Sequence, residues 1–396
     1  MTPTVLASCQ DANELLRATC LRLLLARSEG GECSPRGVKV SEINGFGMMV
    51  REPARRLVSS PRRRVNVGFA AAETLWNLAG RNDVAMVAHY NSQMTAFSDD
   101  GETLRSAYGA RLRGLERNTV GWPKLYGMGD QLTQVVRKLY GDPDTRQAVA
   151  VFRAPGELAV NTKDQICGLS AQFFLRDGAL RQVTHFRSND VWLGVTYDFF
   201  FFSCLQHLVA QALGVPVGPH FWLAGSMHLY ERHYADAMAY IEEQTRLESA
   251  EDPRHRALDW PAYTPVAWPQ DGFPKSNLAW LMSAVTEAIR LETAARAFDV
   301  GGSFKSVEDY AAMLPEPSDD PASVLPMSLA AACVLHMALR HERKVMLELE
   351  SGISPHWDLL GPHLHGIADE CFNVPELPPL VRRIAVDFFR PKDKEE

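Results

Sequence analysis

The chain has 396 residues, of which 46% are hydrophobic, and its formal net charge is −7. This length allows one large domain with a sizeable core and a smaller second domain. The negative charge argues against a nucleic-acid-binding surface. Seven cysteines without a Cys-x-x-Cys pair indicate a reducing compartment, so we expect a cytoplasmic protein without a disulfide framework. We expect no secretory leader, because the N-terminus lacks a short charged segment followed by an apolar core and a cleavage site. We expect no membrane span, because the longest apolar stretch is too short to cross a bilayer.

Hydrophobic periodicity, together with the positions of glycine and proline, predicts helices and strands in alternation. Helices are expected where apolar residues recur every three or four positions: 11–28, 69–80, 129–142, 197–214, 232–247, 277–298 and 328–349. Strands are expected at 38–40 and 48–50, on both sides of Asp177-Gly178, and at 220–230. We interpret 38–50 as a hairpin that turns at Gly45-Phe46-Gly47.

The composition of the chain changes near residue 248. Residues 248–274 are rich in proline and tryptophan, which is typical of a linker or a wrapping loop. We therefore predict a catalytic domain over 1–247 and an added helical region over 275–396. Five histidines lie in that region, but no spacing of cysteine, histidine and carboxylate residues supports a metal site.

The stretch around Cys167 carries most of the chemically active side chains. Cys167 precedes the hairpin predicted at Asp177-Gly178, and Arg187 and Asp190 come at the end of its second strand. A cysteine, an arginine and an acid on one hairpin can supply a nucleophile, a phosphate clamp and a polar orienting group. We therefore expect a reaction site here.

Several motifs around this stretch follow one another in a defined order. They are Cys167-x-x-x-x-Gln172-Phe173, then Arg187-Ser188-x-Asp190-Val191-x-Leu193-Gly194, then a helix, then His228-Leu229-Tyr230. The series resembles the thymidylate synthase superfamily over roughly residues 36–240. The resemblance implies an α/β fold, with a mixed sheet packed against helices, and a homodimer with shared active sites. It also implies two substrates, a pyrimidine nucleoside monophosphate and 5,10-methylenetetrahydrofolate as the one-carbon donor.

The resemblance assigns roles to individual residues. Cys167 is the expected nucleophile, and Glu73 and Tyr108 are expected to handle water and protons. The expected binding residues are Arg187, Ser188, Arg146 and Arg36 for the phosphate, His228 and Tyr230 for the sugar, and Asp190 for the folate. Two motif positions depart from the family pattern: Gly168 replaces the histidine after the nucleophile, and Gln147 replaces the second arginine beside Arg146. Near the sugar-binding strand, Ser226 also replaces an acid and Arg232 replaces an asparagine.

Asp198 stands where the uracil-reading synthases carry asparagine, and this exchange resembles the cytidylate 5-hydroxymethylase branch. A carboxylate accepts a hydrogen bond from the cytosine 4-amino group and, if it shares a proton with ring nitrogen 3, also engages that site. We therefore expect a cytidylate substrate. CMP is favoured over dCMP because Gly168, Ser226 and Arg232 change the polarity of the part of the site where the ribose is expected to bind. Both nucleoside-antibiotic synthesis and DNA modification would use the product.

The expected chemistry needs a thiolate. Its addition to carbon 6 of the pyrimidine makes carbon 5 nucleophilic, and carbon 5 then takes the one-carbon unit. Water on the resulting methylene gives a hydroxymethyl group, whereas hydride from the folate gives a methyl group. Because only the thiolate attacks, we expect the site to lower the pKa of Cys167 through Arg187.

Simpler interpretations stay open at this level. Cys167 can be a core thiol, Glu73 an exposed helix acid, Arg36 a loop arginine and Asp198 a helix cap.

Two other functions of the chain also stay open. One is a uridylate-methylating synthase, against which Asp198 argues. The other is a catalytically silent nucleotide-binding relative, suggested by the two departures from the motif and by the added helical region.

Overall fold

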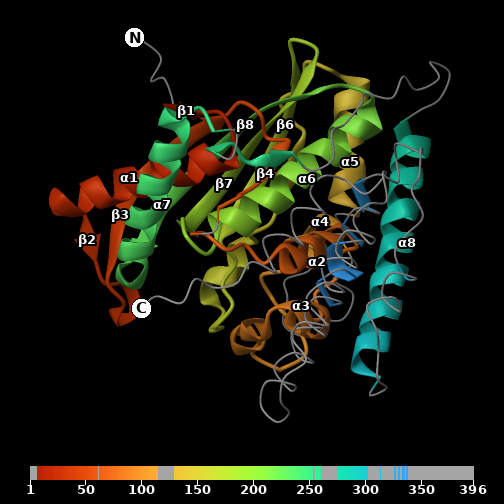
Figure 1. The fold of residues 1–396 in the computed structure, drawn as a ribbon. Helices are drawn as coiled ribbons and strands as arrows, with labels where there is room; N and C mark the ends of the chain where they lie inside the picture. The colour runs from red at the N-terminus through yellow and green to blue at the C-terminus, as the bar shows by residue number, and fades with distance from the viewer. Residues whose placement is uncertain are drawn as a thin grey trace, which may run out of the picture.

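Figure 1 shows the computed structural model, which describes residues 7–60, 62–114, 129–252, 255–259 and 274–301 and short pieces between 313 and 337. A seven-stranded mixed sheet packed with helices forms its centre, as predicted. The strand order is β1-β3-β8-β7-β6-β5, and β2 pairs with β3 off this path. A separate two-stranded sheet joins β4 and β9.

The strands are β1 Ala7–Cys9, β2 Glu32–Cys33, β3 Val40–Val50, β4 Arg55–Leu57, β5 Val149–Val151, β6 Gly168–Arg176, β7 Ala179–Asp190, β8 Val217–Tyr230 and β9 Leu258–Asp259. The α-helices are α1 Ala12–Ser28, α2 Val67–Leu78, α3 Val84–Tyr90, α4 Tyr108–Leu112, α5 Gln131–Gly141, α6 Val195–Leu213, α7 Tyr234–Ser249 and α8 Pro274–Val300. Short 3-10 turns lie at η1 Pro35–Gly37, η2 Ser92–Phe97, η3 Pro155–Ala159 and η4 Glu231–His233.

The β6–β7 hairpin is confirmed, and it turns where the sequence predicts. Asp177 and Gly178 have φ angles of 53° and 73°, and two residues with positive φ make the tight turn whose twist matches that of the flanking strands. After β7 the chain crosses over through α6 and returns as β8, which runs parallel to β7. The hairpin and the crossover together bring the ends of β7 and β8 to one edge of the sheet.

The hairpin predicted over 38–50 is wrong, because β3 is one continuous strand. Its antiparallel register with β8 runs from Val40 opposite Tyr230 to Val50 opposite His220. Gly45, which suggested a turn, lies inside the strand with a φ of 71°, a conformation that glycine adopts without a steric penalty. The long edge of β8 pairs with the backbone on both sides of this glycine, so the strand continues through it.

α6 lies between the sheet and helices α2 and α8 and forms the core of the molecule (Figure 1). Phe199 and Phe202 pack against Trp222 of β8, whereas Phe200 faces the cluster that includes residues of α2 and α8. Each of these rings is buried. Burying such a side chain contributes about 1.5–3 kcal/mol, so both faces of α6 are strongly held.

The helix predicted at 277–298 is present as α8, and a buried carboxylate ties it to α3. Glu292 is 0% exposed. It accepts a hydrogen bond from the Tyr90 hydroxyl at 2.9 Å and pairs with Arg296 at 2.8 Å. Among the described residues no helix is both long and apolar enough to cross a membrane.

Several predictions fall outside the described residues. They include most of the linker expected at 248–274 and most of the helix expected at 328–349. Four of the five C-terminal histidines also fall there: His341, His356, His363 and His365. The division into domains therefore stays a prediction.

Candidate active site

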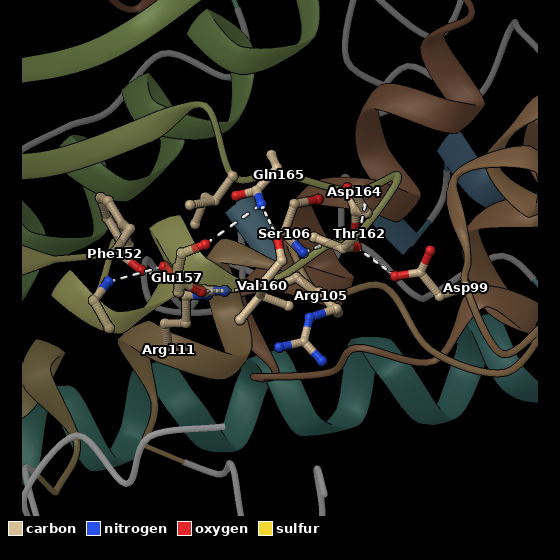
Figure 2. A network of polar contacts seen from close by, with 12 residues as sticks. Asp99, Arg105, Ser106, Arg111, Phe152, Glu157, Val160, Thr162, Asp164 and Gln165 are labelled. Carbon is tan, nitrogen blue, oxygen red and sulfur yellow. Dashed lines mark hydrogen bonds and ion pairs between the residues drawn. The ribbon is translucent and has the colours of Figure 1, made fainter. Parts of the chain in front are cut away.

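A buried ion pair anchors the loop that leads to Cys167 (Figure 2). Arg111 of α4 is 2% exposed and pairs with Glu157 of η3. The same guanidinium donates to the backbone carbonyl of Phe152, and Glu157 accepts from the Ala154 N–H at 2.9 Å. A buried charge is stable only when it is paired and hydrogen-bonded, so these partners hold the start of the loop rigidly.

A second group of contacts holds the end of the same loop (Figure 2). Asp164 accepts from the backbone N–H of Ser106 at 2.8 Å, and Gln165 donates to the carbonyl of Val160 at 2.7 Å. Thr162 donates to Asp99 across the surface. The residue after Gln165 and Ile166 is Cys167, so the nucleophile predicted from the sequence sits on a well-supported backbone.

Arg187 binds this backbone directly. Its Nε donates to the carbonyl of Ile166 at 2.8 Å, and its Nη2 donates to the carbonyl of Gln165 at 2.9 Å. Nη2 also lies 3.5 Å from the Cys167 sulfur. The guanidinium therefore orients the backbone that leads to Cys167, and it also places a positive charge beside the Cys167 thiol.

The pKa of Cys167 is raised above its ordinary value, contrary to our expectation. Burial is the largest cause, and the negative charges of Asp198 and Asp164 act in the same direction. Arg187 and Arg36 favour the thiolate, as predicted, but burial outweighs them. The sequence shows the arginines, whereas the loss of solvation is a property of the folded site.

Glu73, Tyr108 and Asp198 come together from three helices. The Tyr108 hydroxyl donates to Asp198 Oδ1 at 3.4 Å, and the tyrosine ring stacks with Phe201 at a centroid distance of 6.1 Å. The negative charges of Asp198, Cys167 and Glu73 all raise the pKa of Tyr108, in addition to burial. These mutual effects put the four predicted reaction residues in one electrostatic environment.

The two carboxyl groups of this cluster titrate near neutral pH. Burial raises the pKa of Asp198 to about 7, against the opposing hydrogen bonds from Asn189 and Tyr108. Burial and the charge of Asp198 raise the pKa of Glu73 to about 8. Such values suit groups that take up and release protons at physiological pH.

Asp198 does not act as a helix cap. Its oxygens face two side chains, Tyr108 and Asn189, and the Asn189 amide donates to Oδ2 at 2.8 Å. Asn189 in turn accepts from the indole N–H of Trp222 at 3.0 Å. Sequence reasoning missed Asn189, although a buried asparagine inside a strand is unusual enough to signal a specific partner.

Asn77 is a second residue that sequence reasoning missed. It lies on α2, one turn after Glu73, and its side chain accepts from the backbone N–H of Gly109 at 2.8 Å. It also donates to the Glu73 carbonyl at 3.0 Å. Asn77 thereby links α2 to α4 and sets the position of Glu73 relative to Tyr108.

The departure at Gly168 has a steric reason. A Cβ atom at this position would lie 2.8 Å from Cε1 of Tyr108 and 3.3 Å from its Cζ. Real Cβ atoms do not approach other atoms so closely, so any larger residue would displace the tyrosine ring. Glycine at position 168 therefore lets the Tyr108 ring pack against the backbone next to Cys167.

The predicted phosphate residues are spread over three segments. Ser188 is half-buried on β7 beside Arg187, whereas Arg36 and Arg146 are exposed. Arg36 is nevertheless close enough for its charge to act on both Cys167 and His228. The structure therefore brings Arg36 to the site, but within one chain it leaves Arg146 on the surface.

Gln147, which replaces the second arginine, has a cation as its neighbour. The Lys138 ammonium of α5 donates to Gln147 Oε1 at 2.8 Å. A positive charge thus lies next to the position where the family pattern has one. Only the tertiary contact reveals it, because Lys138 and Gln147 come from different elements.

The predicted sugar and folate residues lie at the ends of β7 and β8. His228 and Tyr230 pack edge to face, with centroids 5.3 Å apart, and burial is the main cause that lowers the pKa of His228. Asp190 Oδ1 accepts from the backbone N–H groups of Trp192 at 2.8 Å and Leu193 at 3.2 Å. One oxygen of Asp190 therefore shapes the turn before α6.

The raised pKa of Cys167 predicts a steep pH dependence of its alkylation. Below the pKa, the thiolate fraction rises about tenfold per pH unit, so the iodoacetamide reaction should do the same from neutral to alkaline pH. Peptide mass spectrometry after timed alkylation measures the rate at Cys167. Arg187→Gln should slow the reaction at every pH, whereas Arg176→Gln, far from the thiol, should not. A rate that is constant above neutral pH would contradict the raised pKa.

The raised pKa of Glu73 predicts that Glu73→Gln stabilises the fold at alkaline pH. In the folded state Glu73 has a pKa of about 8, and its ordinary value is 4.5. Between these values the folded state binds more protons, so this contribution to stability is lost as pH rises. The variant should melt a few degrees above the parent at about pH 8 and at nearly the same temperature at about pH 5. Equal melting temperatures at both pH values would contradict this, and Glu102→Gln on the surface is the control.

Comparisons with known proteins match the part of the chain that carries these residues. The thymidylate synthase family model matches residues 34–255. The chain is 39% identical over 209 residues to a deoxyuridylate hydroxymethyltransferase of Bacillus phage SP01, covering 52% of this chain and 54% of that protein. It is 33% identical over 206 residues to a deoxyuridylate hydroxymethyltransferase of Pseudomonas phage M6, covering 49% and 56%. The chain thus matches about half the length of these curated relatives. Because the family match covers more than half of the chain and includes every predicted site residue, the resemblance is confirmed and the chain belongs to the thymidylate synthase family.

Proposed function

We propose that this chain transfers a one-carbon unit from 5,10-methylenetetrahydrofolate to carbon 5 of a pyrimidine nucleoside monophosphate and releases a 5-hydroxymethyl nucleotide. The observation that carries the proposal is the cluster of Cys167, Glu73, Tyr108 and Asp198, whose charges act on one another. Membership of the family and the names of the two relatives support it. A silent relative would have no need for two carboxyls and a thiol in one desolvated space.

The proposed reaction begins with the sulfur of Cys167. The thiolate adds to carbon 6, and carbon 5 forms a bond to the methylene carbon of the folate. Loss of the carbon 5 proton and cleavage of the bond from that methylene to the folate nitrogen leave an exocyclic methylene and tetrahydrofolate. Water adds to the methylene, the sulfur leaves carbon 6, and the thiol is restored.

Glu73 is the group that we assign to the water. A carboxyl with a pKa of about 8 both holds and releases protons close to neutral pH. Ionised Glu73 can take a proton from the water as it attacks, and protonated Glu73 can return one to the leaving group. Tyr108 lies in the same cluster and helps to position the groups between which these protons are transferred.

The base has two candidates. Ionised Asp198 argues for a cytidylate, because a carboxylate accepts from the cytosine amino group. CMP is favoured over dCMP, since Ser226 on the sugar-side strand donates to Glu42 and so keeps a carboxylate near the ribose. The second candidate is deoxyuridylate, which both relatives carry in their names.

We also propose that the active form is a homodimer. Most side chains on one face of the sheet are buried, whereas the opposite face has apolar side chains that stay partly exposed in the single chain: Val149, Val151, Phe174, Val183, Phe221 and Leu223. Val183 and Phe221 are neighbours across β7 and β8, and Gln172 lies between Val183 and Val149. Apolar side chains exposed together on one face of a sheet favour a protein interface. A second copy would cover it and bring an exposed Arg146 to the neighbouring site.

A product assay tests the chemistry. We expect folate-dependent tritium release from carbon 5 of labelled nucleotide, a hydroxymethyl product by mass spectrometry, and tetrahydrofolate as the second product. A methylating synthase would instead oxidise the folate to dihydrofolate, because the folate supplies hydride. Cys167→Ala should abolish release while nucleotide binding persists. Release at the parent rate by this variant would remove Cys167 as the nucleophile.

A mixing experiment tests the shared site. An Arg146→Ala variant and a Cys167→Ser variant should each be nearly inactive, and their mixture should recover activity because a hybrid dimer has one intact site. Sedimentation would establish that the subunits dimerise and exchange. No recovery after confirmed exchange would contradict a site built from two chains.

A further inference from the structure

The side chain of Asn189 can point in only one way. Its Oδ1 accepts from the indole N–H of Trp222 at 3.0 Å, and an indole nitrogen donates but never accepts. Both residues are buried, with Asn189 3% and Trp222 0% exposed. The amide nitrogen therefore always faces Asp198, and it donates to Oδ2 at 2.8 Å.

This donor makes the two oxygens of Asp198 unequal. Oδ2 is held as a hydrogen-bond acceptor, so a proton on it would weaken the contact with Asn189. Among the described residues, the hydrogen-bond partner of Oδ1 is the Tyr108 hydroxyl, at 3.4 Å, a group that can donate or accept. When Asp198 is protonated, the proton therefore belongs on Oδ1.

The Asp198–Asn189 contact packs closely against the backbone at Gly194. A Cβ atom on Gly194 would lie 3.1 Å from Asn189 Nδ2 and 3.3 Å from Asp198 Oδ2. It would also lie 2.9 Å from the backbone oxygen of Asp190. Only glycine at this position lets the two side chains meet.

The oxygens of Asp198 are ordered relative to the pyrimidine ring, if the proposed function holds. Cys167 attacks carbon 6, and we assign Tyr108, which is expected to handle protons together with Glu73, to the side of carbon 5, so Oδ1, next to Tyr108, faces position 4. Oδ2 then faces ring nitrogen 3. With a proton on Oδ1, Asp198 offers a donor at position 4 and an acceptor at position 3, which is the pattern that uracil requires.

Neutral cytosine requires the opposite pattern, an acceptor at position 4 and a donor at position 3. That donor would be a proton on Oδ2, which Asn189 disfavours. We propose that Asn189 is a specificity-determining positioning residue that directs the proton of Asp198 to Oδ1, so that protonated Asp198 reads a uridylate as an asparagine would. This inference rests on the proposed function and names uridylates as its substrate class.

The proposal predicts a dependence on pH. The pKa of Asp198 is about 7, so the proton is present in slightly acidic solution and lost above neutrality. The other ionisable groups of the cluster are Glu73 from α2, Tyr108 from α4, Cys167 before β6 and Asp190 at the end of β7. Of these groups, Glu73 has a pKa in a similar range. A variant in which residue 198 cannot ionise is therefore needed to separate the effect of Asp198 from that of Glu73.

Binding of dUMP and dCMP, measured by calorimetry between about pH 5.5 and about pH 8.5, tests the proposal. In the parent, dUMP affinity should fall about tenfold per pH unit above the pKa of Asp198. In Asp198→Asn, the fall of dUMP affinity above neutral pH should be much smaller, and the remaining slope comes from Glu73 and from the nucleotide phosphate, whose second pKa is about 6. A parent affinity for dUMP that does not change with pH would overturn the proposal.

Two further variants test Asn189 itself. Asn189→Ala should lower the ratio of dUMP to dCMP affinity about tenfold at about pH 6, the effect of one lost hydrogen bond. Trp222→Phe keeps an aromatic ring but frees the amide to flip, so the ratio should move in the same direction without any change at Asp198. Trp76→Phe is the matched control, because it removes an equivalent indole donor that bonds the Asp83 carbonyl instead.

A purely structural role for Asn189 predicts a different result. Both nucleotides would then bind more weakly by the same factor, and a ratio unchanged in both Asn189→Ala and Trp222→Phe would overturn the proposal. The binding measurements do not depend on turnover. If the predicted binding pattern appears without any hydroxymethyl product, the proposed chemistry fails and the role of Asn189 stands.

Discussion

Desolvation of three ionisable side chains in one small space is the constraint on which this site depends. Burial is the largest cause that raises the pKa of Cys167, Glu73 and Asp198. The arginines nearby offset only part of that cost for the thiol. At such a site the thiol and the carboxyl groups keep their protons until the pH rises or a ligand binds. The pKa values of the two carboxyl groups lie in the pH range in which a proton-transfer enzyme operates.

Neutral hydrogen bonds orient the two carboxyl groups, whereas an ion pair and the Arg187 guanidinium hold the backbone that leads to Cys167. Asn189 and Trp222 determine how Asp198 is oriented, and Asn77 joins the helices that carry Glu73 and Tyr108. A neutral donor stabilises a carboxylate less than a cation does, so the carboxyl stays able to take up a proton. The arrangement thus combines rigid positions with adjustable charge.

The helix beyond the family match contributes to the same structure. The match ends at residue 255, whereas α8 begins at Pro274, and this helix packs on α2, α5 and α6. Its buried Glu292 bonds Tyr90 of α3. α8 therefore packs against α2, which carries Glu73, and against α6, which carries Asp198.

The sequence alone determined the family and the order of most elements, because motif spacing, turn residues and hydrophobic periodicity are local properties. From the same motifs it predicted which side chains react. It predicted the Asp177-Gly178 hairpin correctly, but it misread β3 as a hairpin, since only pairing with β8 shows that the strand continues through Gly45. Tertiary structure alone decided the direction of the Cys167 pKa shift and the hydrogen-bond partners of Asn189. Both depend on what surrounds a side chain in space, and solvation and hydrogen-bond partners come from segments far apart in the chain.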